Sequence, residues 1–195
     1  VGQVAEDRDL HVADAFLDLV VAYGKQFRWK TTIGNHRPDV LQELIKQPSV
    51  QIGFADSGAH LRNMGFYNFP LHVLRMARNS EQANGSFLSP EAAIHKLTGE
   101  PAAWFGLDAG VLEVGSRADV TVIDPLGLDG SLDDYHEAPF LELMINRIVR
   151  RNDRAVRATV IGGRIAFECG EFSEDFGKTR YGRFLRADTV DRDPV

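Results

Sequence analysis

Apolar residues recur every three or four positions in several stretches of the chain, which is the pattern of amphipathic helices. The clearest stretch is 68–80, where Leu71, Val73, Leu74 and Ala77 are available for one buried face. Further predicted helices span 8–24, 38–47 and 89–107.

Residues that start and stop helices support these assignments. Gly24 closes the first helix, which Asp14 would cap unless the helix starts earlier. Ser89 is an N-cap candidate followed by Pro90, which suits the first helical position. A break near Gly99 and Pro101 is expected to divide the helix of 89–107 into two.

Two shorter segments, 27–33 and 49–55, have a strand-like composition. Helices and strands therefore alternate in the first half of the chain, as in parallel α/β units. After Leu107 the pattern becomes β-rich, and a Gly-Gly pair within 155–172 predicts a hairpin. The second half is expected to form a small antiparallel sheet, with an apolar-patterned stretch at 140–152.

Charge and composition narrow the possible functions. The 195 residues carry a net charge of −6 without a long basic run, which argues against nucleic-acid partners. No apolar run approaches the ~18 residues of a membrane helix, and the first residues do not resemble a signal peptide. Cys169 has no second cysteine to pair with, so a reducing compartment such as the cytoplasm is expected.

The stretch "VQIGFADSGAH" carries the candidate chemistry, because a predicted strand runs directly into Asp56. A carboxylate at the carboxyl end of a barrel strand can take part in catalysis by accepting a proton from water. An aspartate there can also cap its own turn. The residues alone leave both interpretations open.

Three segments together resemble the carboxyl-terminal part of an amidohydrolase-superfamily enzyme, most closely the N-acyl-D-amino-acid deacylases. They read "IGFADSGAH", "SPEAAIHKLTGEPAAWFGL" and "GVLEVGSRADVTVIDP". The resemblance covers residues 27–172 and implies an α/β fold: the last βα units of a TIM-type (β/α)₈ barrel plus strands of a small β-sandwich. The implied domains are 1–107 for the barrel units and 108–172 for the sandwich, followed by a polar tail at 173–195.

The chain also departs from this family. Only residues 1–107 precede the sandwich segment, whereas a complete barrel takes about 250 residues. The His-x-His motif of the family's first strand is absent. We therefore expect this chain to be a fragment of a larger enzyme.

The resemblance assigns Asp56 two roles, as a metal ligand and as the group that carries a proton from the attacking water to the leaving nitrogen. It implies zinc in the complete enzyme, but one carboxylate cannot supply the three protein ligands of a catalytic site, so this chain alone is not expected to retain it. His60, Asn35 and Arg62 are candidate substrate contacts. The alternatives are a solvated loop histidine, a plain turn and a surface arginine.

Three other residues are interpreted as structural. His72 and His95 fall within predicted helices. Asp119 is expected to sit at the start of a sandwich strand, as its counterpart does in the family.

The implied activity is metal-dependent hydrolysis of a C–N amide bond, with N-acyl-D-amino acids as the expected small-molecule substrates. The alternatives are a cyclic-amide hydrolase similar to a dihydroorotase or hydantoinase, and a non-catalytic association module. A partial barrel leaves open sheet edges, so the partner is expected to be a second copy of the chain or the remainder of its own barrel.

Overall fold

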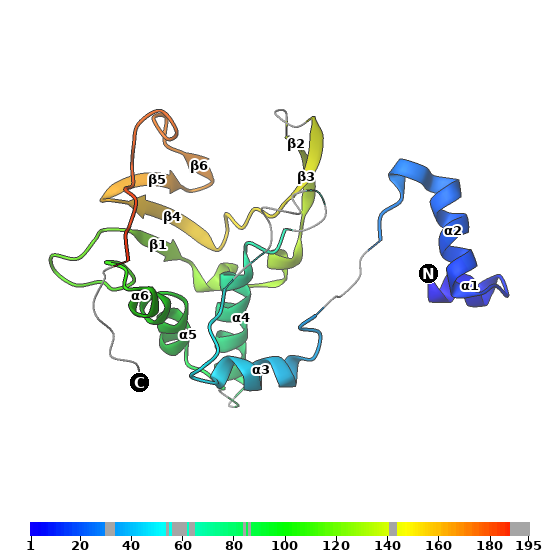
Figure 1. The fold of residues 1–195 in the computed structure, drawn as a ribbon, viewed down its shortest axis with the longest axis horizontal. Helices are drawn as coiled ribbons and strands as arrows, with labels where there is room; N and C mark the ends of the chain where they lie inside the picture. The colour runs from blue at the N-terminus through cyan, green and yellow to red at the C-terminus, as the bar shows by residue number, and fades with distance from the viewer. Residues whose placement is uncertain are drawn as a thin grey trace. The chain divides into compact units, whose positions relative to one another are not determined.

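The computed structural model describes residues 1–29, 34–53, 55, 62, 65–83, 85, 87–140 and 144–187. The chain divides into two compact units, Val1–Leu41 and Gln42–Val195 (Figure 1). No helix among the described residues combines the length and the apolar character needed to cross a membrane.

The first unit contains helices α1 (Gly2–Asp7) and α2 (Val12–Tyr23), followed by the 3₁₀ turn η1 (Gly24–Gln26). The predicted helix of 8–24 is confirmed over α2, but its N-cap is His11, whose ring accepts a hydrogen bond from the Ala13 amide at 3.2 Å. Gly24 ends the helix with a φ of 49°, a conformation that glycine adopts at little cost.

The strand predicted at 27–33 is wrong for the part that is described. Phe27 and Trp29 lie in no strand and instead pack against Phe16 of α2, with ring centroids 5.4–5.7 Å apart. The strand preference of aromatic residues depends on packing against neighbouring strands. Here Phe27 and Trp29 pack against a helix instead. Residues 30–33 lie outside the described residues.

Within the described residues, four further α-helices follow α2 and precede the β part. The helix predicted at 38–47 is α3 (Pro38–Lys46), and the one predicted at 68–80 is α4 (Phe69–Gln82). The predicted pair is α5 (Pro90–Leu97) and α6 (Gly99–Phe105).

The N-cap of α5 and the break between α5 and α6 lie close to where the sequence predicts them. Ser89 caps α5, since its hydroxyl accepts a hydrogen bond from the Ala92 amide at 3.2 Å. The break falls at Thr98, whose backbone leaves the helical region. Pro101 lies in the first turn of α6, where no intrahelical amide bond is lost.

The β part is antiparallel, as predicted. One sheet has the strand order β1 (Val120–Ile123), β4 (Val156–Ile161), β5 (Arg164–Glu168) and β6 (Glu171–Phe172). Gly162 and Gly163 turn the β4–β5 hairpin with φ values of 57° and 79°, as a two-residue hairpin turn requires. A separate hairpin, β2 (His136–Phe140) with β3 (Ile145–Val149), was not predicted as such.

The strand predicted at 49–55 is also wrong for its described residues. Residues 50–53 and 55 have no strand assignment, and residues 50–53 pair with no described strand in a ladder. A strand is stabilised by hydrogen bonds to a neighbour, so strand-like composition alone is insufficient.

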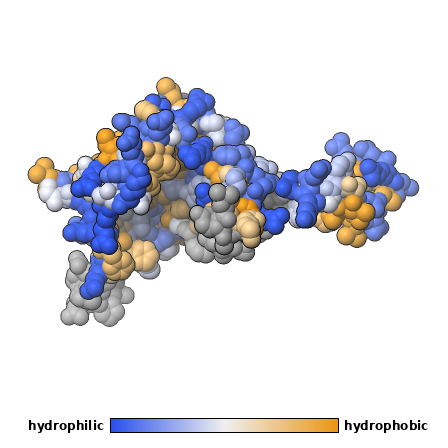
Figure 2. Space-filling model, turned by 90° about the horizontal axis from the view of Figure 1, so that it is seen from above, coloured by the Kyte–Doolittle hydropathy of each residue, from blue (hydrophilic) through white to orange (hydrophobic). Residues whose placement is uncertain are grey.

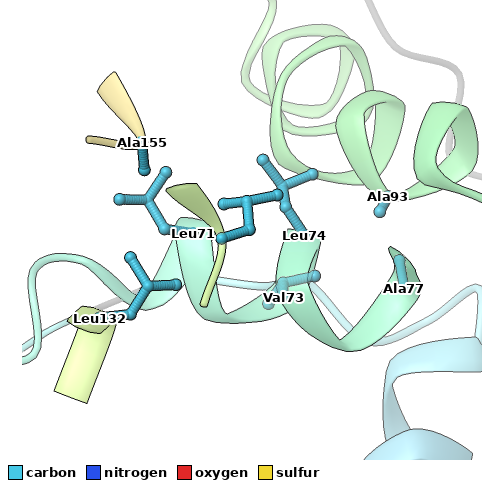
Figure 3. Packing of buried hydrophobic residues seen from close by; sticks show 8 residues of the cluster. Leu71, Val73, Leu74, Ala77, Ala93, Leu132 and Ala155 are labelled. Carbon is cyan, nitrogen blue, oxygen red and sulfur yellow. The ribbon is translucent and has the colours of Figure 1, made fainter. Parts of the chain in front are cut away.

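The core of the larger unit lies along α4. Its buried residues Leu71, Val73, Leu74 and Ala77 are the four that the sequence pattern placed on one face. In Figure 3, Leu132 and Ala155 lie at the Leu71 end of this row, and Ala93 lies at the Ala77 end. Leu132 belongs to the 3₁₀ turn η3 (Gly130–Asp133), which follows η2 (Pro125–Gly127). Helix α4 therefore joins α5 to the β part.

The turn at η2 requires glycine. A Cβ atom at Gly127 would lie 2.3 Å from the Arg154 carbonyl oxygen and 2.5 Å from the Ala155 nitrogen. We expect Gly127→Ala to lower the free energy of unfolding by about 1–3 kcal/mol or more, because backbone must move to make room. Urea unfolding followed by Trp104 fluorescence in a Trp29→Phe background measures this.

The matched control is Gly130→Ala, where an added Cβ meets no atom within 4 Å. It should change the stability by less than about 1 kcal/mol. Equal effects of the two variants would contradict the close approach of η2 to Arg154.

Candidate functional site

The predicted site residues lie in different parts of the chain. Asp56 and His60 lie outside the described residues. Asn35 is exposed in the first unit, with a φ of 55° that suits a turn asparagine. Arg62 is exposed in the second unit. Asn35 and Arg62 thus belong to different units.

The described chain on both sides of residues 54–64, here called the Asp56 segment, is firmly attached. On the upstream side, Lys96 of α5 donates a hydrogen bond to the Gln47 carbonyl at 3.2 Å. The Gln51 side-chain amide donates to Glu100 of α6 at 3.2 Å. Ile52 packs against the core cluster. The chain leading into the Asp56 segment is thus held by α5, α6 and the core.

On the downstream side, the attachment runs to the β part. Buried Asn68 donates from its side-chain amide to the Leu132 carbonyl and to the Asn152 side chain, both at 3.0 Å. The Arg150 amide donates to the Tyr67 hydroxyl. Gly65 is so close to β3 that an added Cβ would lie 2.8 Å from a methyl carbon of Ile148. The chain leaving the Asp56 segment therefore has a fixed path as well.

Two arginines of α4 attach this helix to the turns that precede β2. Arg75 donates to the Asp129 carbonyl at 2.8 Å and to the Asp133 carboxylate at 2.9 Å. Arg78 donates to the carbonyls of Pro125 and, at 2.7 Å, Leu128. Sequence reasoning missed both residues, because an arginine on a helix gives no sign of which distant carbonyls it will meet.

His72 lies beside Arg75 and Asp133. Its Nδ1 is 3.0 Å from an Arg75 nitrogen and 4.0 Å from the Asp133 carboxylate. Burial, followed by the positive charge of Arg75, lowers the pKa of His72. The hydrogen bond from Arg75 is the main cause of the lowered pKa of Asp133. The expected structural role of His72 agrees with these contacts.

Asp119 also has a structural role, as expected. Its carboxylate accepts a hydrogen bond from the Gly162 amide at 2.6 Å, next to the start of β1. It also lies 3.5 Å from Arg117 Nε. Asp119 thereby fixes the turn of the β4–β5 hairpin.

Within the part of the chain that the structure describes, no group of three or more His, Cys, Asp or Glu side chains is arranged to hold a metal ion. The described polar groups instead hold backbone carbonyls and turns in place. Their arrangement fixes the described chain before and after the Asp56 segment.

The sequence profile of the amidohydrolase family matches residues 36–166, more than half of the chain. The chain belongs to the amidohydrolase family. This match covers the Asp56 segment, helices α4 to α6 and most of the antiparallel sheet, while Asn35 lies just outside it. Amidohydrolases are hydrolases built on the TIM-barrel architecture and are generally metal-dependent.

Three relatives of this amidohydrolase are uncharacterized proteins, one from Mycobacterium bovis and two from the CDC 1551 and H37Rv strains of Mycobacterium tuberculosis. Each is 48% identical over 194 residues, which is 95% of this chain and 32% of the relative. The chain thus spans about a third of the length of these relatives. No solved structure matches it.

The environment of His72 predicts a pH dependence of stability. Because the folded pKa lies below the ordinary 6.5, the unfolded chain binds more protons between the two values. The free energy of unfolding should therefore fall as the pH is lowered through 6.5 toward the folded pKa of His72. Asp133 adds a separate loss only below its ordinary value of 3.8.

We expect His72→Gln to flatten the stability profile between pH 7 and pH 5, as measured by urea unfolding at a series of pH values. The exposed His136→Gln serves as the control and should leave the slope as in the wild type. An unchanged slope in His72→Gln would show that this histidine does not link protonation to folding.

Proposed function

We propose that this chain is part of a metal-dependent amidohydrolase that hydrolyses a C–N amide bond, with N-acyl-D-amino acids as the substrate class. The observation that carries the proposal is the family match over residues 36–166, which includes the "IGFADSGAH" motif. The fixed paths of the chain before and after the Asp56 segment support it, because a catalytic group needs a defined position.

The proposed architecture places the last βα units of a TIM-type barrel in residues 1–107 and part of a β-sandwich in 108–172, with a polar tail at 173–195. The antiparallel sheet of β1, β4, β5 and β6 supports the sandwich assignment. The relatives, about three times as long as the chain, have room for a complete barrel.

In the proposed mechanism Asp56 accepts a proton from the attacking water and delivers it to the departing amine nitrogen. His60, Asn35 and Arg62 are proposed to contact the substrate, Arg62 by a bidentate pair with its carboxylate. Zinc is the proposed metal, and when bound it would lower the pKa of water. Its binding would need ligands other than the described residues, since these do not form a metal site.

We place this enzyme in the cytoplasm. Support comes from Cys169, which is exposed and has no second cysteine in the chain with which to form a disulfide.

The test of the proposed chemistry uses an enzyme of the relatives' length that contains this chain. Asp56→Asn keeps the side-chain shape but removes the proton acceptor. We expect kcat for N-acetyl-D-amino acids to fall by about 10²–10⁴-fold, the usual cost of losing a general acid–base. Asp18→Asn, an exposed carboxylate of α2, is the control and should retain activity.

Hydrolysis of N-acetyl-L-amino acids, dihydroorotate and hydantoins should be measured in parallel. Faster turnover of a cyclic amide than of any N-acyl-D-amino acid would reject the substrate class. Near wild-type turnover by Asp56→Asn would reject the catalytic role of Asp56.

We also propose that the chain associates with a second copy or with the remainder of its own barrel. Large apolar side chains remain exposed on the second unit, among them Leu112, Val114, Leu126 and Phe184. Figure 2 shows apolar areas between hydrophilic ones on one face of the surface. Strand β1 is at one edge of its sheet, and among the described strands it pairs with β4 alone. An edge of this kind invites pairing with another chain.

Light scattering should therefore give the isolated chain a mass above 21.7 kDa, the mass of one copy. Val122→Lys adds a charge to the edge strand and should shift the chain toward the monomer, because edge lysines oppose pairing. A wild-type mass of one copy at every concentration would contradict self-association.

A further inference from the structure

We infer that Lys96 is a positioning residue for Asp56, acting together with Glu100 on the chain that leads into the Asp56 segment. The inference rests on the proposed function in taking Asp56 as the catalytic group. The juxtaposition of Lys96, Glu100 and the backbone of residues 47–51 carries it.

Lys96 is unusual because it is 6% exposed, and buried lysines are rare unless they are paired. Its ammonium lies 3.2 Å from a Glu100 carboxylate oxygen and donates to the Gln47 carbonyl. The same Glu100 oxygen accepts the hydrogen bond from Gln51. We call these four residues, Gln47, Gln51, Lys96 and Glu100, the upstream clamp.

The upstream clamp joins two helices to one stretch of non-helical chain. Lys96 lies on α5 and Glu100 on α6, on the two sides of the break at Thr98. Gln47 and Gln51 are four residues apart in the connected stretch, and Ile52, next in the chain, packs on the core. Ile52 precedes Asp56 by four residues, so the upstream clamp holds chain that is close to Asp56 in the sequence.

Stability alone does not account for a charged clamp at this place. Replacing a buried ion pair by apolar residues of similar size is often neutral or stabilising. An apolar pair could fill the space but could not direct a hydrogen bond to a particular carbonyl. Directional bonds matter here because residues 50–53 lie in no strand ladder within the described residues.

The clamp is therefore expected to affect catalysis more than folding. A displacement of about 1 Å at a catalytic group can cost about 10²-fold in rate. Loss of the clamp should lower kcat by about 10- to 100-fold and leave KM within about threefold, because Asp56 is proposed to act on the proton and not to bind the substrate.

The experiment replaces the whole pair, Lys96→Met with Glu100→Met, so that no buried charge is left unpaired. In the enzyme of the relatives' length, steady-state kinetics should show the fall in kcat with KM retained. In the 195-residue chain, hydrogen exchange at residues 47–53 should become faster. The free energy of unfolding, measured with urea, should stay within about 1 kcal/mol of the wild-type value. Lys46→Met is the control, because Lys46 forms an exposed pair with Glu43 at 2.7 Å.

A second variant keeps the test decisive if the double variant does not fold. Gln51→Ala removes one bond of the clamp at an exposed side chain and leaves the Lys96–Glu100 pair in place. It should fold normally, exchange faster at residues 47–53 and lower kcat by a smaller factor than the double variant.

Two outcomes are distinguishable. Wild-type kcat and wild-type exchange in both variants, together with an inactive Asp56→Asn, would overturn the positioning role while supporting the proposed function. An enzyme without amidohydrolase activity, or one indifferent to Asp56→Asn, would reject the proposed function and with it any catalytic role of Lys96. The exchange measurement would then decide only whether the clamp orders residues 47–53.

Discussion

The burial of one face of α4 against the turns of residues 125–133 is the contact on which the larger unit depends. Leu71 and Leu74 leave water by packing with Leu132 and Ala155, and each buried leucine contributes about 1.5–3 kcal/mol. This packing brings turn carbonyls close to the helix, where an unpaired carbonyl would cost about 1–3 kcal/mol. Arg75 and Arg78 remove that cost by donating to them.

Elements defined by local periodicity were predictable from the sequence. Helix α4 and the β4–β5 hairpin follow from residues close together in the chain, a repeated apolar face in one case and a Gly-Gly turn in the other. The strands predicted at 27–33 and 49–55 failed over their described residues. Strand formation depends on a neighbour that local composition does not specify: Trp29 packs on a helix, and Gln51 bonds to one.

The candidate site likewise has one part that the sequence predicts and one part that it does not. The motif around Asp56 could be recognised in the sequence because it resembles a motif of the amidohydrolase superfamily. The family match agrees with that superfamily assignment. Lys96 and Glu100 were not singled out, because Lys and Glu four residues apart are typical of a solvent-exposed helix surface. Only the fold shows that this pair is partly buried and faces the chain leading to Asp56.

The hydrogen bonds of Asn68 set an order of assembly. Asn68 bonds to Leu132, 64 residues later, and to Asn152, 84 residues later. Synthesis adds roughly 5–20 residues per second, so Asn68 is made several seconds before Asn152 exists. The attachment of Gln47 and Gln51 to α5 and α6 needs only the next 50 or so residues. During synthesis the chain before the Asp56 segment can thus be attached first, while the attachment of Asn68, after the segment, must await the β part.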